Sequence, residues 1–284
     1  MCAPHSFAVH SQSKTLVSAD GTKIYANCVG DPSKPAVIFI HGFCFSSVVF
    51  EPIFIDPEWV RYDVRGHGRS GNATDQAAWE SKRLAEDFEA VVQGLNLVKP
   101  FIAGWTLGVT HITDILSFHA PSYLSGIIMI APVTHTDYES LTKVGTAATL
   151  SFLPSLTQSV DVNAYHDAGK AFVSLCSDDF PYLLRQACLG SVLSQSPNVT
   201  TLLLSRFQDK TDLSNTGKNS NLPLLVLYGD QDKVVKGDVT VHSLEDWRNL
   251  KVVIFERGDH VPWLGHAGAF RRELLHWVDL FTNK

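Results

Sequence analysis

A threonine stands between two glycines in the stretch Gly104-Trp105-Thr106-Leu107-Gly108. In the pattern Gly-x-nucleophile-x-Gly, a sharp turn from strand to helix holds the central side chain above a sheet. The helix N-terminus and the next backbone N–H can then stabilise negative charge that develops there. An apolar run precedes the turn at 101–104 and a helix-like run follows at 107–120, so the sequence predicts that Thr106 is a nucleophile.

A hydroxyl is a poor nucleophile at its own pKa and needs an imidazole base, which a carboxylate in turn orients. Both groups occur late in the chain after strand-like runs, in Gly229-Asp230-Gln231-Asp232 and in Gly258-Asp259-His260-Val261-Pro262. Asp230 and Asp232 end the same strand and compete for the role of acid. The Gly-x-x-Asp spacing favours Asp232, whereas Asp230 is expected to cap a turn.

The segments around these residues alternate between strand and helix. A hairpin is predicted over 15–28, where Asp20-Gly21 supplies the turn. Continuous apolar runs are typical of central parallel strands, and the apolar face of 76–94 is typical of a helix on a sheet. Such alternation predicts a mostly parallel sheet with helices on both sides. Further strands are expected at 36–40, 60–64, 101–104, 126–131, 224–228 and 251–255, and a last helix at 267–281.

Two other segments complete a family pattern. His41-Gly42-Phe43 follows the strongest early strand, and Asp63-Val64-Arg65-Gly66-His67-Gly68-Arg69-Ser70 is a long and uncommon string. With the turn at Thr106, the chain resembles the α/β-hydrolase family, close to its esterase, lactonase and epoxide-hydrolase-like members. The resemblance covers nearly the whole chain and is weakest over 133–221. It implies an α/β-hydrolase core at 1–132 and 222–284, with a helical lid or cap insertion at 133–221.

The resemblance also implies roles for single residues. Thr106 would be the nucleophile, Asp232 the acid and His260 the base, in the family's order along the chain. The backbone N–H groups of Phe43 and Leu107 would form the oxyanion hole.

Other conspicuous side chains are given structural roles or a place in the pocket. The resemblance implies that Asp63, Arg65 and His67 brace a loop and that His41 orients the oxyanion loop. Trp105 and Trp263 flank the catalytic positions, and either is a candidate for substrate contact or for packing. Cys44 has no dedicated base in the sequence and is not expected to react. Apolar residues of the lid are candidate pocket walls, many of them lid core instead: Phe152, Leu153, Leu156, Tyr165, Phe172, Tyr182 and Leu183.

Threonine where the family carries serine leaves three functions open. The added methyl stiffens the side chain and crowds the turn. The first function is hydrolysis of a small hydrophobic ester or lactone, by a nucleophile that is impaired or altered. The second is non-hydrolytic chemistry of the lyase, cyclase or cofactor-free oxygenase kind, in which the His260–Asp232 pair is the base. The third is ligand binding by a pseudo-enzyme. Epoxide hydrolysis and dehalogenation are excluded because they need a carboxylate at position 106.

Composition and motifs argue against several classes of binding partner and cofactor. The net charge of −6 argues against nucleic-acid binding, which needs a basic face. No ligand spacing indicates a metal site, no cofactor is implied, and the Gly-rich motif of dinucleotide binding is missing. The five cysteines show no zinc spacing and are expected to be free thiols. Neither a secretion signal nor a run long enough to span a membrane is recognised, so a cytoplasmic location is expected. No pattern sets the oligomeric state.

Overall fold

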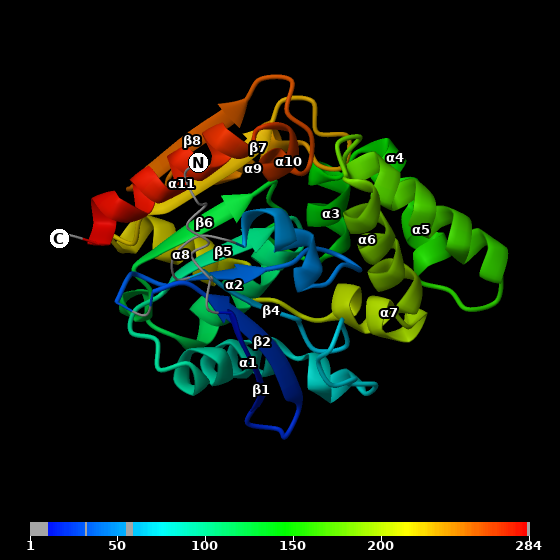
Figure 1. The fold of residues 1–284 in the computed structure, drawn as a ribbon, viewed down its shortest axis with the longest axis horizontal. Helices are drawn as coiled ribbons and strands as arrows, with labels where there is room; N and C mark the ends of the chain where they lie inside the picture. Colours follow the sequence, from blue (N-terminus) through cyan, green and yellow to red (C-terminus); the bar gives the residue numbers. More distant parts are fainter. Residues whose placement is uncertain (1–10, 32, 55–58, 283–284) are drawn as a thin grey trace, which may run out of the picture.

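The computed structural model describes residues 11–31, 33–54 and 59–282, and the first ten residues, with Cys2, lie outside them. Its eight-stranded sheet has the order β1-β2-β4-β3-β5-β6-β7-β8 (Figure 1). The pairs β1–β2 and β2–β4 are antiparallel and all later pairs are parallel, which confirms the mostly parallel sheet and the hairpin. The strands are β1 (Ser11–Val17), β2 (Lys23–Val29), β3 (Val37–Ile40), β4 (Trp59–Tyr62), β5 (Phe101–Trp105), β6 (Gly126–Ile130), β7 (Leu224–Gly229) and β8 (Leu250–Phe255).

Helices cover both faces of the sheet. Successive residues of the central strands point to opposite sides, and because these residues are apolar, both faces need a layer of helices to bury them. Ile38, Ile102 and Ile127 belong to a core shared with α1 (Ser81–Gly94) and α2 (Gly108–Phe118). Phe39, Phe101 and Ile128 belong to a second core, which is closed by α11 (Ala267–Thr282) and the short helix η1 (Ser47–Ile53). This two-sided burial explains why the strands are apolar without alternation.

The predicted helix at 76–94 is two helices. A short helix η2 (Gln76–Trp79) is capped by Asp75, whose carboxylate accepts from the Ala78 N–H. Glu80 then takes an extended conformation (φ −60°, ψ 145°), which interrupts the helix before α1 begins. The expected apolar face of α1 is buried, with Leu84, Phe88, Val91 and Val92 in the interior.

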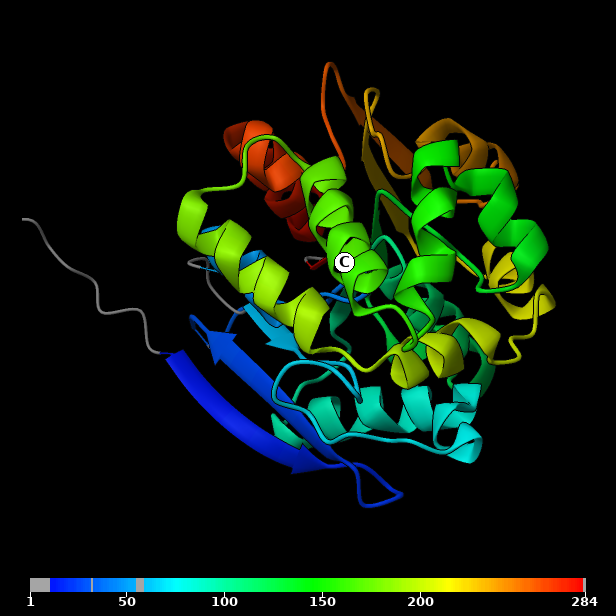
Figure 2. The ribbon, with the colours of Figure 1, turned by 90° about the vertical axis from the view of Figure 1, so that its right-hand side faces the viewer.

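The stretch between β6 and β7 is helical, as expected. Helices α3 to α7, here called the helical insertion, lie beyond the carboxyl ends of the strands (Figures 1 and 2). The helix α8 differs from them, because its Leu213 joins the core with α2 although it falls within the predicted lid segment 133–221. The bounds are α3 (Tyr138–Val144), α4 (Ala147–Leu156), α5 (Val162–Cys176), α6 (Tyr182–Ser194), α7 (Pro197–Ser205) and α8 (Thr211–Asn219); α9 (Gly237–Ser243) and α10 (Pro262–Gly265) follow β7 and β8.

Across the residues that the structure describes, every helix is too short or too polar to cross a membrane. Cys44, Cys176 and Cys188 are buried free thiols.

Candidate active site

Thr106 occupies the turn between β5 and α2. Its backbone has φ of +48°, a left-handed conformation that a β-branched residue rarely adopts. The Thr106 N–H donates to the Ile130 carbonyl at 2.8 Å, and the Val109 N–H donates to the Thr106 carbonyl at 3.1 Å. At Gly108 a side chain would lie 2.6 Å from the His41 carbonyl, so only glycine lets α2 approach the end of β3 so closely. The expected turn from strand to helix is confirmed.

An acid and a base meet beside this turn. Asp232 follows β7 and His260 follows β8, and His260 Nδ1 lies 2.7 Å from Asp232 Oδ2 with both side chains buried. The other carboxylate oxygen of Asp232 accepts the N–H groups of Val234 and Val235, at 2.7 Å and 3.1 Å. The loop after β7 thus holds the Asp232 carboxylate in place, and the carboxylate in turn sets the orientation of the His260 ring. The competing Asp230 is exposed.

His260 Nε2 is the atom left for proton transfer. It is buried and has no hydrogen-bond partner among the described residues. A neutral imidazole that donates from Nδ1 to a carboxylate keeps Nε2 as an acceptor, which is the tautomer that a general base needs. The His260 ring packs on Trp105, with ring centroids 5.2 Å apart. The arrangement can therefore accept a proton from a group placed above the elbow.

Phe43, Thr106 and Leu107 line one small cavity under the helical insertion. Neither the Phe43 N–H nor the Leu107 N–H finds an acceptor in the part of the chain that the structure describes. The cavity holds about 50 Å³, and none of the described residues that line it is charged. Its walls are Val133, Leu141, Val144, Gly145, Thr149, Leu150, Leu153, Phe172, Leu204, Val234 and Val235. Two residues whose N–H groups are unpaired and one residue with a hydroxyl thus line an otherwise largely apolar chamber.

Comparison with known proteins settles the family. The family model described as alpha/beta hydrolase fold matches residues 35–267. The chain belongs to the alpha/beta hydrolase family. It is 22% identical to a pimeloyl-[acyl-carrier protein] methyl ester esterase of Legionella pneumophila (strain Corby), over 83% of this chain and 91% of that protein.

Two further comparisons show which other proteins this alpha/beta hydrolase is similar to. It is 34% identical to the probable oxidoreductase EphD of Mycobacterium tuberculosis over 97 residues, 33% of this chain, and the match spans only 16% of that longer protein. Its fold is similar to the crystal structure of an esterase, RhEst1, from Rhodococcus sp. ECU1013. The TM-score is 0.85 at 25% identity, and the match covers 95% of this chain and 99% of that one.

The two tryptophans that flank the proposed catalytic residues are buried in the core and do not line the cavity. Trp105 is fully buried and its Nε1 donates to the His260 carbonyl at 2.8 Å. Trp263 is also buried and donates to the Val49 carbonyl at 3.2 Å. Neither lines the cavity over Thr106. The structure therefore gives both the packing role, and Trp105 in addition holds the backbone of His260.

The expected pocket walls are only partly the observed ones. Of the seven apolar lid residues considered, Leu153 and Phe172 line the cavity, whereas Tyr182 and Leu183 are exposed on the outer surface. The walls that sequence reasoning missed include Leu141 and Leu150. Leu150 lies three residues before Leu153 on α4, so helical spacing from Leu153 could have found it.

The string 63–70 forms a buried bracing network, as expected. Arg65 donates twice to the Asp87 carboxylate, at 2.7 Å and 2.6 Å, with no exposure of its own side chain. Asp63 accepts the N–H groups of Ser47 and Arg69, both at 2.8 Å. These contacts join the loop after β4 to α1 and to η1. They hold the loop whose Val64 N–H donates to His41 Nε2 at 3.0 Å, close in sequence to the proposed oxyanion donor Phe43.

Cys44, beside the proposed oxyanion donor, is not poised to react. Burial raises the pKa of its thiol to about 12, because the thiolate would lose its hydration. Its sulfur lies 3.8 Å from the Thr200 hydroxyl.

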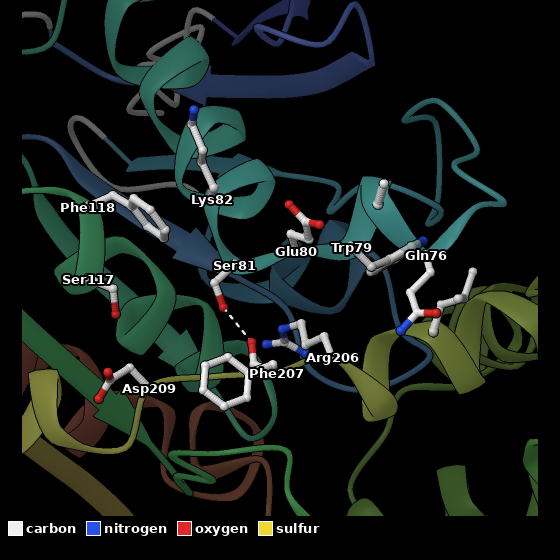
Figure 3. A pocket seen from close by; sticks show the side chains of 12 residues that line it. Gln76, Trp79, Glu80, Ser81, Lys82, Ser117, Phe118, Arg206, Phe207 and Asp209 are labelled. Atoms are coloured by element: carbon white, nitrogen blue, oxygen red, sulfur yellow. Dashed lines mark hydrogen bonds between the residues drawn. The ribbon is translucent and has the colours of Figure 1, made fainter.

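A larger cavity lies outside this site, between the start of α1, the end of α2 and the segment after α7 (Figure 3). Phe118 and Phe207 are among its lining residues, and Ser81 donates to the Phe207 carbonyl at 2.9 Å. Phe43, Thr106 and Leu107 are not among its lining residues, so it lies apart from the proposed nucleophile and the proposed oxyanion donors. The larger of the two cavities is therefore not the one beside the elbow.

Proposed function

We propose that this alpha/beta hydrolase cleaves a small hydrophobic ester or lactone with Thr106 as nucleophile, His260 as base and Asp232 as acid. The observation that carries the proposal is the buried 2.7 Å contact between His260 and Asp232 beside a left-handed elbow. A buried carboxylate that fixes an imidazole in this way is the arrangement that acyl transfer requires. The pair also argues against a purely ligand-binding role, since a binder has no need of a positioned base.

The proposed reaction has two steps. His260 Nε2 takes the proton of the Thr106 hydroxyl while Oγ1 attacks the carbonyl carbon, and the alcohol leaves with that proton. His260 then takes a proton from water as the water attacks the acyl-threonine, and passes it to Thr106 Oγ1 as the bond between Oγ1 and the acyl carbon breaks and the acid is released. In both steps the backbone N–H groups of Phe43 and Leu107 donate hydrogen bonds to the substrate oxygen and stabilise its negative charge.

The size and the lining of the cavity support a substrate whose acyl group is small and uncharged. About 50 Å³ holds roughly four water-sized groups, at ~10–15 Å³ for each. A carboxylate or ammonium on the acyl group would lose its hydration there without a charged partner. The relatives' names, an esterase and a methyl ester esterase, support an ester substrate of the same chemical class.

The test is hydrolysis of p-nitrophenyl acetate and butyrate by the native chain and by His260→Ala. We expect measurable turnover that His260→Ala lowers at least a hundredfold, since general base catalysis contributes roughly 10²–10⁴. Equal rates for the two proteins would refute the proposal. An exposed histidine variant, His242→Ala, serves as the matched control and should hydrolyse at the native rate.

A second function has its own supporting observation. The γ-methyl of Thr106 is held at the elbow, and His260 Nε2 receives no hydrogen bond from the Thr106 hydroxyl. A base that is free of its nucleophile can abstract a proton directly from a substrate, without a covalent intermediate. Turnover of a non-ester substrate that survives Thr106→Ala and is lost in His260→Ala would favour this function over hydrolysis.

A further inference from the structure

Gln195, at the end of α6 in the helical insertion, reaches into the core of the hydrolase. Only 6% of it is exposed. Its amide Nε2 lies 2.8 Å from His67 Nε2, although the two residues are 128 positions apart in the chain. This contact ties the insertion to the loop that follows β4.

The direction of this hydrogen bond follows from the other side of the His67 ring. His67 Nδ1 lies 2.9 Å from the Arg65 carbonyl, which can only accept, so Nδ1 carries the proton. The Nε2 atom of a neutral His67 must then accept, and the Gln195 amide donates. Burial lowers the pKa of His67 to about 3, so the ring stays neutral at physiological pH.

His67 in turn packs on His41, with ring centroids 5.0 Å apart. His41 Nε2 accepts the Val64 N–H at 3.0 Å, so its Nδ1 carries the proton and donates to the Gly42 carbonyl at 3.0 Å. The Gly42 carbonyl and the Phe43 N–H belong to the same peptide bond, which is planar and trans. A hydrogen bond that holds the carbonyl oxygen therefore also sets the direction of the Phe43 N–H.

We propose that Gln195 is a positioning residue for the oxyanion hole, acting through His67 and His41 on the Gly42–Phe43 peptide. The inference rests on the proposed function in one respect, namely that the Phe43 N–H stabilises the oxyanion. A second contact, between the Ser46 and Ser191 hydroxyls at 2.8 Å, joins the loop after β3, which carries Gly42 and Phe43, to the helix α6. Docking of α6 on the core would thus complete the donor geometry, although no residue of α6 lines the cavity itself.

Two substitutions separate the donated hydrogen bond from the packing of the side chain. Gln195→Met keeps the length and volume but cannot donate, and Gln195→Glu keeps the shape but, when ionised, can only accept. The matched control is Asn198→Ala, which removes a 3.3 Å bond from the nearby α7 to the Thr74 carbonyl and leaves His67 untouched.

The direct measurement is the ¹H–¹⁵N resonance of the Phe43 amide. We expect it to shift in both Gln195 variants and to stay in place in Asn198→Ala. In ester hydrolysis we expect kcat to fall roughly tenfold to a hundredfold with little change in KM, because a misplaced donor weakens only the transition state. Affinity for a boronic acid, a mimic of the tetrahedral intermediate, should fall with kcat.

An unchanged Phe43 resonance in the two Gln195 variants, with native kcat, would overturn the proposal. If Gln195→Met alone kept the native Phe43 resonance and the native kcat, only the packing of the side chain would matter, and the proposal would be overturned as well. Absence of ester hydrolysis in the native chain would count against the proposed function, while the Phe43 resonance would still decide the role of Gln195. Gln195→Glu carries the test if the methionine variant does not fold.

Discussion

The γ-methyl group of Thr106 lies against the Cα of Gly42, in the volume that any side chain at position 42 would take. The elbow and the loop that carries the proposed oxyanion donor Phe43 therefore touch through this methyl group as well as through Trp105. Thr106 holds this position at a φ of +48°, where a β-branched residue bears strain of order 1–3 kcal/mol. Threonine at 106 and glycine at 42 consequently depend on each other.

Thr106→Ser is expected to accelerate ester hydrolysis by about ten- to a hundredfold. Loss of the methyl relieves the strain and frees the hydroxyl to rotate toward His260 Nε2, and a displacement of ~1 Å is worth about that factor. The measurement is kcat/KM with p-nitrophenyl butyrate. Thr113→Ser removes a buried methyl from the same helix α2, away from the elbow, and should leave the rate unchanged. A serine variant no faster than the native chain would show that the methyl does not limit the nucleophile.

Gly42→Ala should lower both stability and turnover, because its new methyl would collide with that of Thr106. The double variant Gly42→Ala/Thr106→Ser should regain part of the loss, since one of the two colliding groups is gone. Contacts with Trp105, at 3.1 Å and 3.2 Å from the added carbon, remain and limit the recovery. Urea denaturation of the four proteins gives the coupling energy, which for touching residues is roughly 0.5–3 kcal/mol. Strictly additive effects would contradict the contact.

Asp232→Asn is expected to reduce ester hydrolysis by about 10³–10⁴, because an amide cannot hold the tautomer of His260 or stabilise its charged form. Asp230→Asn is the matched control, because Asp230 follows the same strand but is exposed. The two variants should keep the same fold by circular dichroism and differ in kcat. A comparable loss in Asp230→Asn would mean that the acid had been assigned to the wrong residue.

The placement of the proposed catalytic residues could be predicted because each follows a strand of the parallel sheet. Thr106, Asp232 and His260 stand after β5, β7 and β8, and parallel strands bring their carboxyl ends to one edge. The strands are local patterns of continuous apolar residues, which can be recognised without knowledge of the tertiary structure.

The walls of the cavity and the partners of the bracing loop could not be predicted in the same way. The contact of Gln195 with His67 joins residues 128 positions apart, and it depends on how α6 packs on the core. Trp105 illustrates the same limit. Its neighbour Thr106 lines the cavity, but the Trp105 indole packs against Phe50 and Trp263 in the same core and donates to the His260 carbonyl.

The buried ion pair of Arg65 with Asp87 should dominate the stability of the bracing loop. Asp87→Asn is expected to cost about 3–5 kcal/mol, because the buried guanidinium then keeps only the more exposed of its two charged partners in the described structure, Asp20 at 2.9 Å. Lys210→Met breaks an ion pair whose lysine is half exposed and should cost at most about 1 kcal/mol. Urea denaturation at pH 7 measures both. Equal losses in the two variants would show that burial does not strengthen the Arg65 pair.

Stability should fall as the pH is lowered below about 6.5. Burial lowers the pKa of His41, of His111 and of His67, the last to about 3, so these rings stay neutral in the folded protein. The unfolded chain, with histidine pKa near 6.5, binds protons that the folded chain does not. The free energy of unfolding therefore decreases between pH 6.5 and 5, by up to ~1.4 kcal/mol per pH unit for each such histidine.

His67→Asn tests this dependence, because it removes one of the three groups. The variant is expected to be less stable at pH 7.5 yet to lose less stability on acidification, with the slope reduced by about one proton. Urea denaturation at intervals from pH 7.5 to 5 gives the slope for each protein. His242→Asn, at an exposed position on α9, should keep the native slope. A slope in His67→Asn as steep as that of the native chain would mean that His67 is not held neutral, and the hydrogen bond donated by Gln195 would then have no acceptor.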